Sequence, residues 1–510
     1  MAGDLDPALA AQLERAAFYG LSGEVRRIDT HTAAVFLVGD SAFKIKKPVR
    51  FPYLDFSDRA ARSRVCHDEV RINQRTAPSL YLGLRPVLRD DGGYSLGSRH
   101  SAGAEDPPAL VDWMVEMARF DPDLVLSELI ERAPDALERR HWWALADEIA
   151  NLHAAAEADH SFDAAAEQAE IAAGSLAELG QSPALFPPDR LTALGETLSA
   201  AIAAQTALMQ QRQRAGLVQR GHGDLHLRNI VLLEDRPTLF DALEFDPDLA
   251  TGDVLYDIAF LLMDLGLRDQ RRAANLVFNR YLERREDYGG LSLLPLFLAQ
   301  RALIAAKIAA VQGETRRARA AFAFAEQSLA PPPPRLLMVG GTSGTGKSTL
   351  AGALAPDLAP PPGAVWLRSD VTRKVMLGRA PEETLPASAY QGKVSGRVRD
   401  ILAERAGLAL DAGFAVIVDA VFGTRDWRDT VASAAAGRPR RGLWLSAPLD
   451  TRLSRVGARS GDASDADADV ARAQRVDPPA ADEPWMEITS AGTIDETVKQ
   501  AKHGLTDLLD

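Results

Sequence analysis

One ten-residue stretch, GGTSGTGKST at residues 340–349, constrains the fold more than any other part of the 510-residue chain. It contains the spacing of a phosphate-binding loop, with Gly341, Gly346, Lys347 and Ser348 in the required positions. An apolar run precedes the stretch and a helix-forming run follows it, which is the strand–loop–helix context that such a loop needs. The sequence therefore predicts a parallel α/β sheet whose first loop holds the phosphates of a nucleotide.

The residue types in this loop indicate how it would bind ATP and Mg²⁺. Glycines, Gly344 included, let successive backbone N–H groups converge on phosphate oxygens, and the N-terminus of the following helix adds favourable polarity. We expect Lys347 to reach the β- and γ-phosphates, Ser348 to bind Mg²⁺ and Thr349 to join the nucleotide-binding set. A later apolar strand ends in Asp419, which we expect to be a second residue that organises the metal.

Two positions near strand ends favour a kinase of small substrates over an ATPase without an acceptor. Asp370 ends the segment VWLRSD, where a carboxylate can activate a hydroxyl group. Arg373 follows one helical turn later and can bind an anionic group of the acceptor. Arg425, shortly after the strand that ends in Asp419, is a further candidate contact with substrate.

The segment DTRLSRVGARSGDASDADADV, residues 450–470, predicts a helix, a lid that bears arginines and a second helix. Arg455 and Arg459 would close over the transferring phosphoryl group and exclude water. The alternative for both arginines is a solvated helix face. We expect Ser464 or Asp465 to cap the second helix.

A second motif, HGDLHLRN at residues 222–229, lies in the first half of the chain and separates Asp224 from Asn229 by five positions. Phosphoryl transfer needs a carboxylate that accepts the proton of the attacking hydroxyl, and oxygen ligands for Mg²⁺. The catalytic loop of kinases uses this same Asp-to-Asn spacing. A short hairpin over residues 230–240 then leads to Asp241, which we expect to be another Mg²⁺ ligand.

The ATP-binding half of this first site is expected upstream, in the strand AFKIKKPV. Lys44 and Lys46 lie on one face of that strand because side chains alternate along it, and we prefer Lys44 as the phosphate-binding lysine. Glu69, on a predicted helix, is the expected partner that holds the lysine. Because no glycine-rich loop precedes the strand, backbone amides and hydroxyls near residues 30–32 would have to cover the phosphates.

The motif HGD…N followed by LFD resembles the aminoglycoside phosphotransferase-like family of kinase folds. The resemblance implies a bilobal, protein-kinase-like fold with a small lobe over about residues 1–120 and a helical large lobe over about 121–330. It also implies Asp224 as the catalytic base, with Asn229 and Asp241 as Mg²⁺ ligands.

The second half of the chain resembles the P-loop kinases that include polynucleotide 5′-kinases, gluconate kinase-like enzymes and zeta-toxin-like proteins. The resemblance implies Asp370 as the base, Arg373 as an acceptor-binding residue and the lid arginines as groups that stabilise charge. Four consecutive prolines at residues 331–334 predict a linker between the two halves, because proline stiffens the chain and removes backbone donors. The expected domains are therefore residues 1–330 and residues 335–510.

Charge and cysteine content limit the partners that the chain is expected to have. The net charge is −13, without the broad basic excess of a duplex-binding protein, so the composition argues against nucleic acid. The longest apolar segment, residues 293–311, contains Arg301 and Lys307 and is therefore expected to be a buried helix and not a membrane span. The only cysteine, Cys66, is expected to be a packed side chain in a protein of the reducing cytoplasm.

These observations together predict two ATP- and Mg²⁺-dependent phosphotransfer sites that act on hydroxyl groups of small molecules. The resemblance points to a sugar, amino sugar or aminoglycoside-like acceptor at the first site, and a small acceptor that can itself be anionic at the second. Three alternatives stay open: one site senses nucleotide while the other turns over, the chain is a nucleotide-switched binding protein, or the second site is a polynucleotide 5′-kinase. The sequence does not fix the oligomeric state.

Overall fold

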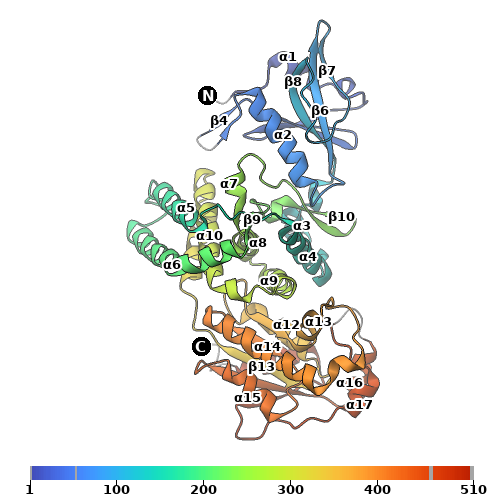
Figure 1. Ribbon diagram of the computed structural model, residues 1–510, viewed down its shortest axis with the longest axis vertical. Coiled ribbons are helices and arrows are strands. Elements are labelled where there is room, and N and C mark those ends of the chain that lie inside the picture. The colour runs from blue at the N-terminus through green and yellow to red at the C-terminus, as the bar shows by residue number, and fades with distance from the viewer. Residues whose placement is uncertain (1–2, 52–53, 459–462, 506–510) are drawn as a thin grey trace. The chain divides into compact units, whose positions relative to one another are not determined.

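The computed structural model describes residues 3–51, 54–458 and 463–505, and these residues form two compact units (Figure 1). Unit 1 comprises residues 1–164 and 212–258, and unit 2 comprises residues 165–211 and 259–510. Helices that precede the four prolines therefore share unit 2 with the P-loop sheet. The division into residues 1–330 and 335–510 stays a prediction about domains.

Unit 1 is built on a six-stranded antiparallel sheet in the order β1-β2-β3-β8-β6-β7. The strands are β1 (Arg26–Asp29), β2 (Ala33–Val38), β3 (Ser41–Lys46), β6 (Tyr81–Asp90), β7 (Gly93–Leu96) and β8 (Leu110–Ala118). Alternation along β3 buries Phe43 and Ile45 in one core, which also includes residues of α1 (Pro7–Leu13). Helix α2 (Arg59–Asn73) packs on the other face, where Cys66 and Trp113 are fully buried. This packing confirms the expectation that Cys66 is a packed side chain.

The rest of unit 1 is mainly helices and short hairpins. It comprises β4 (Arg50–Phe51), β5 (Leu54–Asp55), α3 (Leu126–Arg132), α4 (Arg139–Ala155), β9 (Val218–Arg220), β10 (Ile230–Leu233), β11 (Arg236–Leu239), α7 (Pro247–Ala250) and β12 (Thr251–Asp253). Glu234 and Asp235 have φ values of 47° and 64°, so a two-residue turn with left-handed backbone joins β10 to β11. This tight hairpin fixes how far Asp241 follows the catalytic motif.

Helices make up the first part of unit 2 and lead to its parallel sheet. They are α5 (Ala164–Leu179), α6 (Pro188–Arg214), α8 (Val254–Leu267), which begins in unit 1, α9 (Arg271–Arg285), α10 (Leu294–Val311) and α11 (Thr315–Leu329). One helical stretch of the described residues, 288–311, is long and apolar enough to cross a membrane by length and composition, with a mean hydropathy of 1.6. Because 61% of its apolar window is buried inside the protein, it serves as a core helix here.

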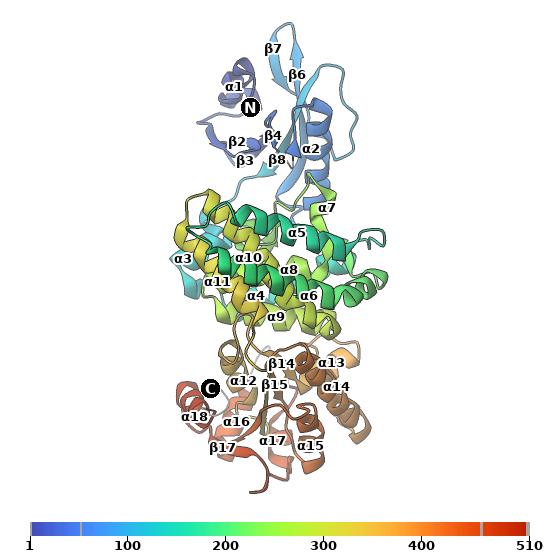
Figure 2. The same cartoon turned by 90° about the vertical axis from the view of Figure 1, so that its left-hand side faces the viewer.

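The sheet of unit 2 has five parallel strands in the order β14-β15-β13-β16-β17. Its strands are β13 (Leu336–Gly341), β14 (Val365–Arg368), β15 (Val416–Asp419), β16 (Arg440–Ser446) and β17 (Trp485–Thr489). The flanking helices are α12 (Lys347–Leu354), α13 (Ser369–Met376), α14 (Gly392–Asp411), α15 (Arg425–Ser433), α16 (Leu449–Gly457), α17 (Ala468–Ala473) and α18 (Ile494–Gly504) (Figure 2). Crossover helices on both faces keep the strands parallel and buried.

Helix α9 covers the edge of this sheet at β14 through two buried asparagines. The Oδ1 atom of Asn279 accepts a hydrogen bond from the backbone N–H of Trp366 at 2.6 Å. The Nδ2 atom of Asn275 donates to the carbonyl oxygen of Ala364 at 2.9 Å. Side chains of α9 thus occupy hydrogen-bonding groups that an edge strand otherwise leaves to solvent or to another strand.

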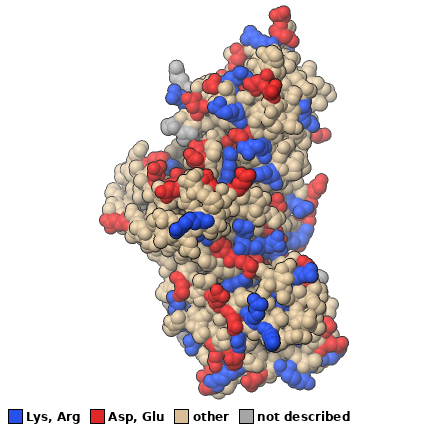
Figure 3. Space-filling model, in the orientation of Figure 1, with Lys and Arg blue, Asp and Glu red and all other residues tan. Residues whose placement is uncertain are grey.

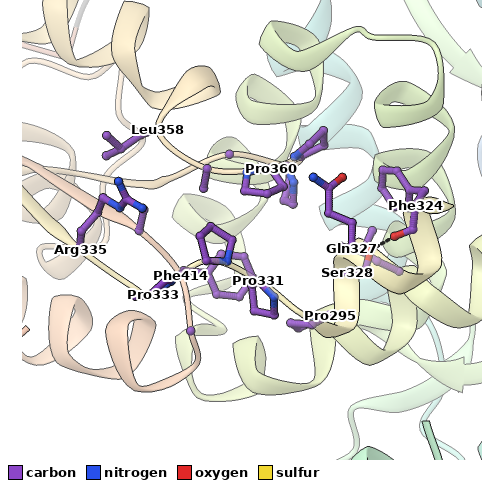
Figure 4. A pocket seen from close by; sticks show the side chains of 18 residues that line it. Pro295, Phe324, Gln327, Ser328, Pro331, Pro333, Arg335, Leu358, Pro360 and Phe414 are labelled. Atoms are coloured by element: carbon purple, nitrogen blue, oxygen red, sulfur yellow. Dashed lines mark hydrogen bonds between the residues drawn. The ribbon is translucent and has the colours of Figure 1, made fainter. Parts of the chain in front are cut away.

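A proline-lined cavity lies elsewhere in unit 2 (Figure 4). Its walls include Pro331, Pro360, Phe324, Phe414 and Arg335. Arg335 and Phe414 come just before β13 and β15, so the cavity lies at the amino ends of the parallel strands. The phosphate-binding loop follows the carboxyl end of β13, and the cavity is therefore separate from it.

Candidate active sites

Three charged side chains in unit 1 form the centre of the first candidate site. The Nζ atom of Lys44 lies 2.7 Å from Oε1 of Glu69 and 2.9 Å from Oδ1 of Asp241. Burial alone would lower the pKa of Lys44, but the carboxylates of Asp241 and Glu69 hold that pKa well above its ordinary value. The structure thus brings together three residues that come from β3, α2 and the segment after β11.

A second lysine, more deeply buried than the first, completes this cluster. The Nζ atom of Lys46 lies 2.7 Å from Oε2 of Glu69 and also pairs with Glu244. Lys46 and Glu69 are almost completely buried, so each oxygen of the Glu69 carboxylate faces a different lysine. The spacing of Lys44 and Lys46 predicted a shared strand face, but no sequence signal pointed to Glu244.

Two uncharged residues fix the segment that carries Asp241. The backbone N–H of Asp241 donates to the hydroxyl oxygen of Tyr81 at 3.1 Å, and that of Ala242 donates to Oδ1 of Asn73 at 2.8 Å. Asp241 has a φ of 57°, a backbone conformation that places its carboxylate back toward Lys44. Sequence reasoning missed both Tyr81 and Asn73, although Asn73 lies one helical turn after Glu69.

The predicted catalytic loop brings Asp224 and Asn229 into direct contact. The Nδ2 atom of Asn229 donates to Oδ2 of Asp224 and to its carbonyl oxygen, both at 2.9 Å. The Nε2 atom of His226 lies 3.4 Å from the same carboxylate. Burial raises the pKa of Asp224, but the hydrogen bond and charge of His226 together with the charge of His222 outweigh burial, so the net pKa lies below the ordinary value. The carboxylate is therefore ionised at neutral pH and able to accept a proton.

Asp257 holds this loop from below. Its carboxylate accepts hydrogen bonds from the backbone N–H groups of His222 at 2.8 Å and Gly223 at 2.9 Å. The Nε2 atom of His153 lies 3.1 Å from the same carboxylate, and both side chains are buried. Asp257 therefore braces the catalytic loop, and His153 is a packed side chain that contacts it.

The donor set of unit 1 fits a Mg²⁺ ion. Because Nδ2 of Asn229 faces Asp224, its amide oxygen is directed away from that carboxylate. The 43% exposed carboxylate of Asp241 supplies anionic oxygens. Amide and carboxylate oxygens are the ligands that Mg²⁺ prefers in proteins. Asn229 and Asp241 are therefore suitable residues to hold the ion.

The phosphate-binding loop of unit 2 has the backbone conformation that its glycines permit. Gly341, Gly344 and Gly346 have φ values of 135°, 85° and 88°. A Cβ atom on Gly344 would lie 2.6 Å from the carbonyl oxygen of Arg452, so only glycine fits there. Lys347 begins α12 and its Nζ atom donates to the carbonyl oxygen of Thr342 at 3.1 Å.

Polar residues from neighbouring strands converge beside Lys347. Asp419, at the end of β15, is buried, and Ser348 is close enough to lower its pKa. Burial raises the pKa of Asp419 against the opposing effects of Lys347 and Ser348. Asp370 is close enough to add to this rise and lies in the first turn of α13, two residues beyond the end of β14. A hydroxyl and a carboxylate next to a phosphate-binding lysine suit Mg²⁺.

Arg452 of the lid segment and Gln474, which follows that segment, contact the phosphate-binding loop. Arg452, on α16, donates through Nε to the carbonyl oxygen of Ser343 at 3.0 Å, and Gln474 accepts from the backbone N–H of Ser343 at 2.7 Å. Arg455 donates to the carbonyl oxygen of Ser490 at 2.6 Å. Arg459 lies outside the described residues. Arg452 and Gln474 are contacts that sequence reasoning missed.

The expected cap of the helix after the lid is wrong. Asp467 caps α17 by accepting from the N–H of Val470, whereas Asp465 pairs with the buried Lys374 at 2.9 Å. Asp465 also accepts a hydrogen bond from Tyr390. Asp465, Asp467 and Asp469 occupy alternate positions, so the local sequence did not show which of them caps the helix. The ion pair with buried Lys374 holds Asp465 away from that role.

The two predicted substrate arginines occupy different settings. Arg373 is buried, with its guanidinium 4.7 Å from the ring centre of Tyr390 and a hydrogen bond of 2.8 Å to the carbonyl oxygen of Ala389. Burial lowers the pKa of Arg373 and Asp370 raises it. Arg425 is exposed and pairs with Asp482 at 2.9 Å. Arg373 therefore lies beside Asp370, and the described contacts of Arg425 are with exposed carboxylates.

Two family models match the chain. Residues 56–294 match the model described as "Phosphotransferase enzyme family", and residues 336–477 match the model described as "AAA domain". The chain therefore contains a phosphotransferase-family domain followed by a P-loop domain. The predicted fold class is confirmed: the protein is a multidomain α/β protein with a kinase-like fold and a parallel P-loop sheet. The two matches support a phosphotransferase.

Relatives resemble the chain over nearly its whole length. Uncharacterized proteins of Mycobacterium tuberculosis and Mycobacterium bovis are each 29% identical over 496 residues, covering 93% of this chain and 94% of theirs. A gluconokinase from Sinorhizobium meliloti aligns with 35% of this chain and 94% of its own at 21% identity and a TM-score of 0.27. A choline/ethanolamine kinase family protein from Mesorhizobium loti aligns with 63% of this chain and 95% of its own at 14% identity and a TM-score of 0.36.

Proposed function

We propose that the chain is a tandem phosphotransferase, with one ATP- and Mg²⁺-dependent site in each half that acts on hydroxyl groups of small molecules. The observation that carries the proposal is the ion-pair cluster of Lys44, Glu69 and Asp241 in the same unit as the Asp224–Asn229 loop. Phosphoryl transfer depends mainly on positioning and on stabilisation of charge, and this cluster supplies both. Residues 1–330 and 335–510 are the functional halves in this proposal, and the cytoplasm is its proposed location.

At the first site the acceptor hydroxyl gives its proton to the carboxylate of Asp224. The hydroxyl oxygen then bonds to the γ-phosphorus of ATP as the bond to the β–γ bridging oxygen breaks and ADP leaves. Mg²⁺, when held by Asn229 and Asp241, supplies positive charge that offsets the phosphates. Lys44 binds the phosphates and Glu69 keeps the lysine in place. The acceptor class proposed here is a sugar, amino sugar or aminoglycoside-like compound.

At the second site Lys347 and the loop amides hold the phosphates, while Ser348 and Asp419 hold Mg²⁺. Asp370 acts as the base, and Arg373 orients a small acceptor that can be anionic. Arg455 stabilises charge on the transferring group. The effects of Lys347, Ser348 and Asp370 on the pKa of the buried Asp419 show that these residues lie near one another, which supports this assignment.

One observation favours a second candidate, in which the first site senses nucleotide and only the second turns over. The hairpin between β1 and β2 contains Thr30, His31 and Thr32 where a glycine-rich loop would cover the phosphates. The hydroxyl of Thr30 is engaged with the backbone of Ala33, at 2.9 Å from its nitrogen. This arrangement leaves fewer free donors for phosphate than a glycine-rich loop provides.

Transfer of labelled phosphate from ATP to a metabolite extract, read by mass spectrometry, tests the proposal. The wild type is compared with Asp224→Asn and Lys347→Ala. We expect each variant to lose a different phosphorylated product and keep the other. Loss of all products in one variant and of none in the other supports the sensing alternative. Tight ATP binding or hydrolysis without any phosphorylated product contradicts both, and phosphorylation of 5′-hydroxyl oligonucleotides would assign the second site to nucleic acid.

A further inference from the structure

Arginine side chains gather beside the strand that leads into the catalytic loop of unit 1. Arg71 and Arg75 lie at the carboxyl end of α2 and just beyond it, and Arg220 is the last residue of β9. A terminal nitrogen of Arg75 donates to the carbonyl oxygen of Gly221 at 3.3 Å, so its guanidinium lies against the residue next to Arg220. Each of Arg75 and Arg220 is within electrostatic reach of the other and of Arg71.

This cluster has an excess of positive charge. Arg71 pairs with Asp68 at 2.6 Å, but neither Arg75 nor Arg220 forms an ion pair with any carboxylate in the described part of the chain. Burial, together with repulsion from the neighbouring arginines, lowers the pKa of both Arg75 and Arg220. Like charges held close together repel one another, and an anion bound between them would offset that repulsion.

The carboxylates that attract Arg220 electrostatically are engaged with other groups. Asp68 pairs with Arg71, and Glu244 pairs with the buried Lys46. Asp246 caps α7 by accepting from the backbone N–H of Asp248 at 2.9 Å. All three attract Arg220 at longer range without a direct contact.

Donors of Arg220 are also left without partners. Its Nε and Nη2 atoms are shielded from solvent, and neither has a hydrogen-bond partner among the described residues. Buried donors in folded proteins are nearly always satisfied, and an unsatisfied donor on a charged group carries a larger cost than a neutral one. The Nε and a terminal nitrogen of one guanidinium form a fork that matches two oxygens of a carboxylate or phosphate group.

We propose that Arg75 and Arg220 form a binding site for one oxyanion group, a phosphate or a carboxylate, carried by a small molecule or present as the free ion. The site lies between α2, which carries Glu69, and β9, which leads to Asp224. An anion bound there would link the helix that positions Lys44 to the loop that holds the proposed base. The site does not depend on transfer activity, because its ligand is defined by the two guanidinium groups alone.

Isothermal titration calorimetry on the full chain tests this site with inorganic phosphate and with acetate. The background variant is Lys44→Met with Lys347→Ala, because the two proposed nucleotide sites would otherwise bind phosphate too. Arg220→Met and Arg75→Met are each made in this background. The matched control is Arg59→Met, at the other end of α2, where the arginine pairs with Asp106 at 2.8 Å.

We expect at least one probe to bind to the background protein. Its affinity should be at least tenfold weaker after Arg220→Met or Arg75→Met. Its affinity should not change after Arg59→Met. Binding of phosphate alone, of acetate alone or of both shows which class of oxyanion the site accepts. If circular dichroism shows that a methionine variant does not fold, Arg220→Lys replaces it. Lysine keeps the positive charge but loses the two-nitrogen fork of the guanidinium, so this variant should also bind the probe more weakly. Absence of binding by both probes in the background protein, or binding that survives the loss of either arginine, overturns the proposal.

Discussion

The ammonium group of Lys44 lies 2.9 Å from Oδ1 of Asp241, although 197 positions separate the two residues in the chain. The lysine is thus paired with the carboxylate that we propose as a metal ligand. Nucleotide and Mg²⁺ would give each of them a further partner of opposite charge. The ion pair holds the two groups close together, which is the positioning that phosphoryl transfer needs.

Replacing Lys44 tests its role in the first site directly. Lys44→Met is expected to lower first-site transfer by about 100-fold or more, because a charged group that faces the transferring phosphate is lost. Products of the second site should not change. The measurement is product formation by mass spectrometry, with Lys307→Met, which removes a lysine paired with Glu178 at 3.1 Å in unit 2, as the control. Equal loss of both products would contradict separate sites.

The ion pair also predicts how stability depends on pH. Burial would raise the pKa of Asp241, but Lys44 lowers it to about 2. Because the folded pKa is below the unfolded value, the contribution to stability is fully present above about pH 4 and is lost as pH falls toward 2. For a partly exposed carboxylate we expect about 1 kcal/mol. Denaturant unfolding of the wild type and Asp241→Asn at several pH values should converge near pH 2 if the account is correct.

Lys46 should contribute to stability more than to nucleotide binding. Lys46→Met leaves the buried carboxylates of Glu69 and Glu244 short of a counter-charge, and removing one partner of a buried ion pair costs roughly 3–5 kcal/mol. Adding Glu244→Gln to Lys46→Met should restore part of that loss, since an uncompensated charge is removed. Urea unfolding of the single and double variants measures the coupling. Strictly additive losses would show that Lys46 and Glu244 do not interact.

Gly344 should be intolerant of a side chain. Gly344→Ala places a Cβ atom 2.6 Å from the carbonyl oxygen of Arg452 at a φ of 85°, so the loop must shift and the backbone is strained. We expect at least tenfold weaker nucleotide binding at the second site, measured with a fluorescent ATP analogue in the Lys44→Met background. Gly407→Ala, in α14 with no atom near the added Cβ, is the control and should stabilise the helix by about 0.5–1 kcal/mol.

Local patterns in the sequence predicted the parts of both sites that depend on spacing along the chain. The phosphate-binding loop, the Asp224–Asn229 contact and the pairing of Lys44 with Glu69 all follow from short motifs or from strand and helix periodicity. Contacts across long stretches of sequence could not be predicted. Glu244 reaches Lys46 over 198 positions, and Gln474 reaches the N–H of Ser343 over 131.

The strands of the parallel sheet and the surface charges were also only partly predictable from the sequence. Strand β17 was not predicted, because its five residues are mostly only partly buried or exposed and have no long apolar run. The charge balance argued against a nucleic-acid surface, and on the face drawn in Figure 3 basic and acidic side chains are interspersed. Which charges pair with one another depends on the folded arrangement and not on composition.

The two asparagines of α9 bear on how the chain is made. Synthesis proceeds from the amino end, so α9 leaves the ribosome about eighty residues before the strand whose edge it covers. Asn279 and Asn275 are therefore already available to hydrogen-bond with Trp366 and Ala364 when these two residues emerge. The edge of β14 can then be covered before it pairs with another polypeptide. A protein fragment that begins after the prolines would lack α9. The edge of β14 would then be exposed, and exposed edge strands promote self-association.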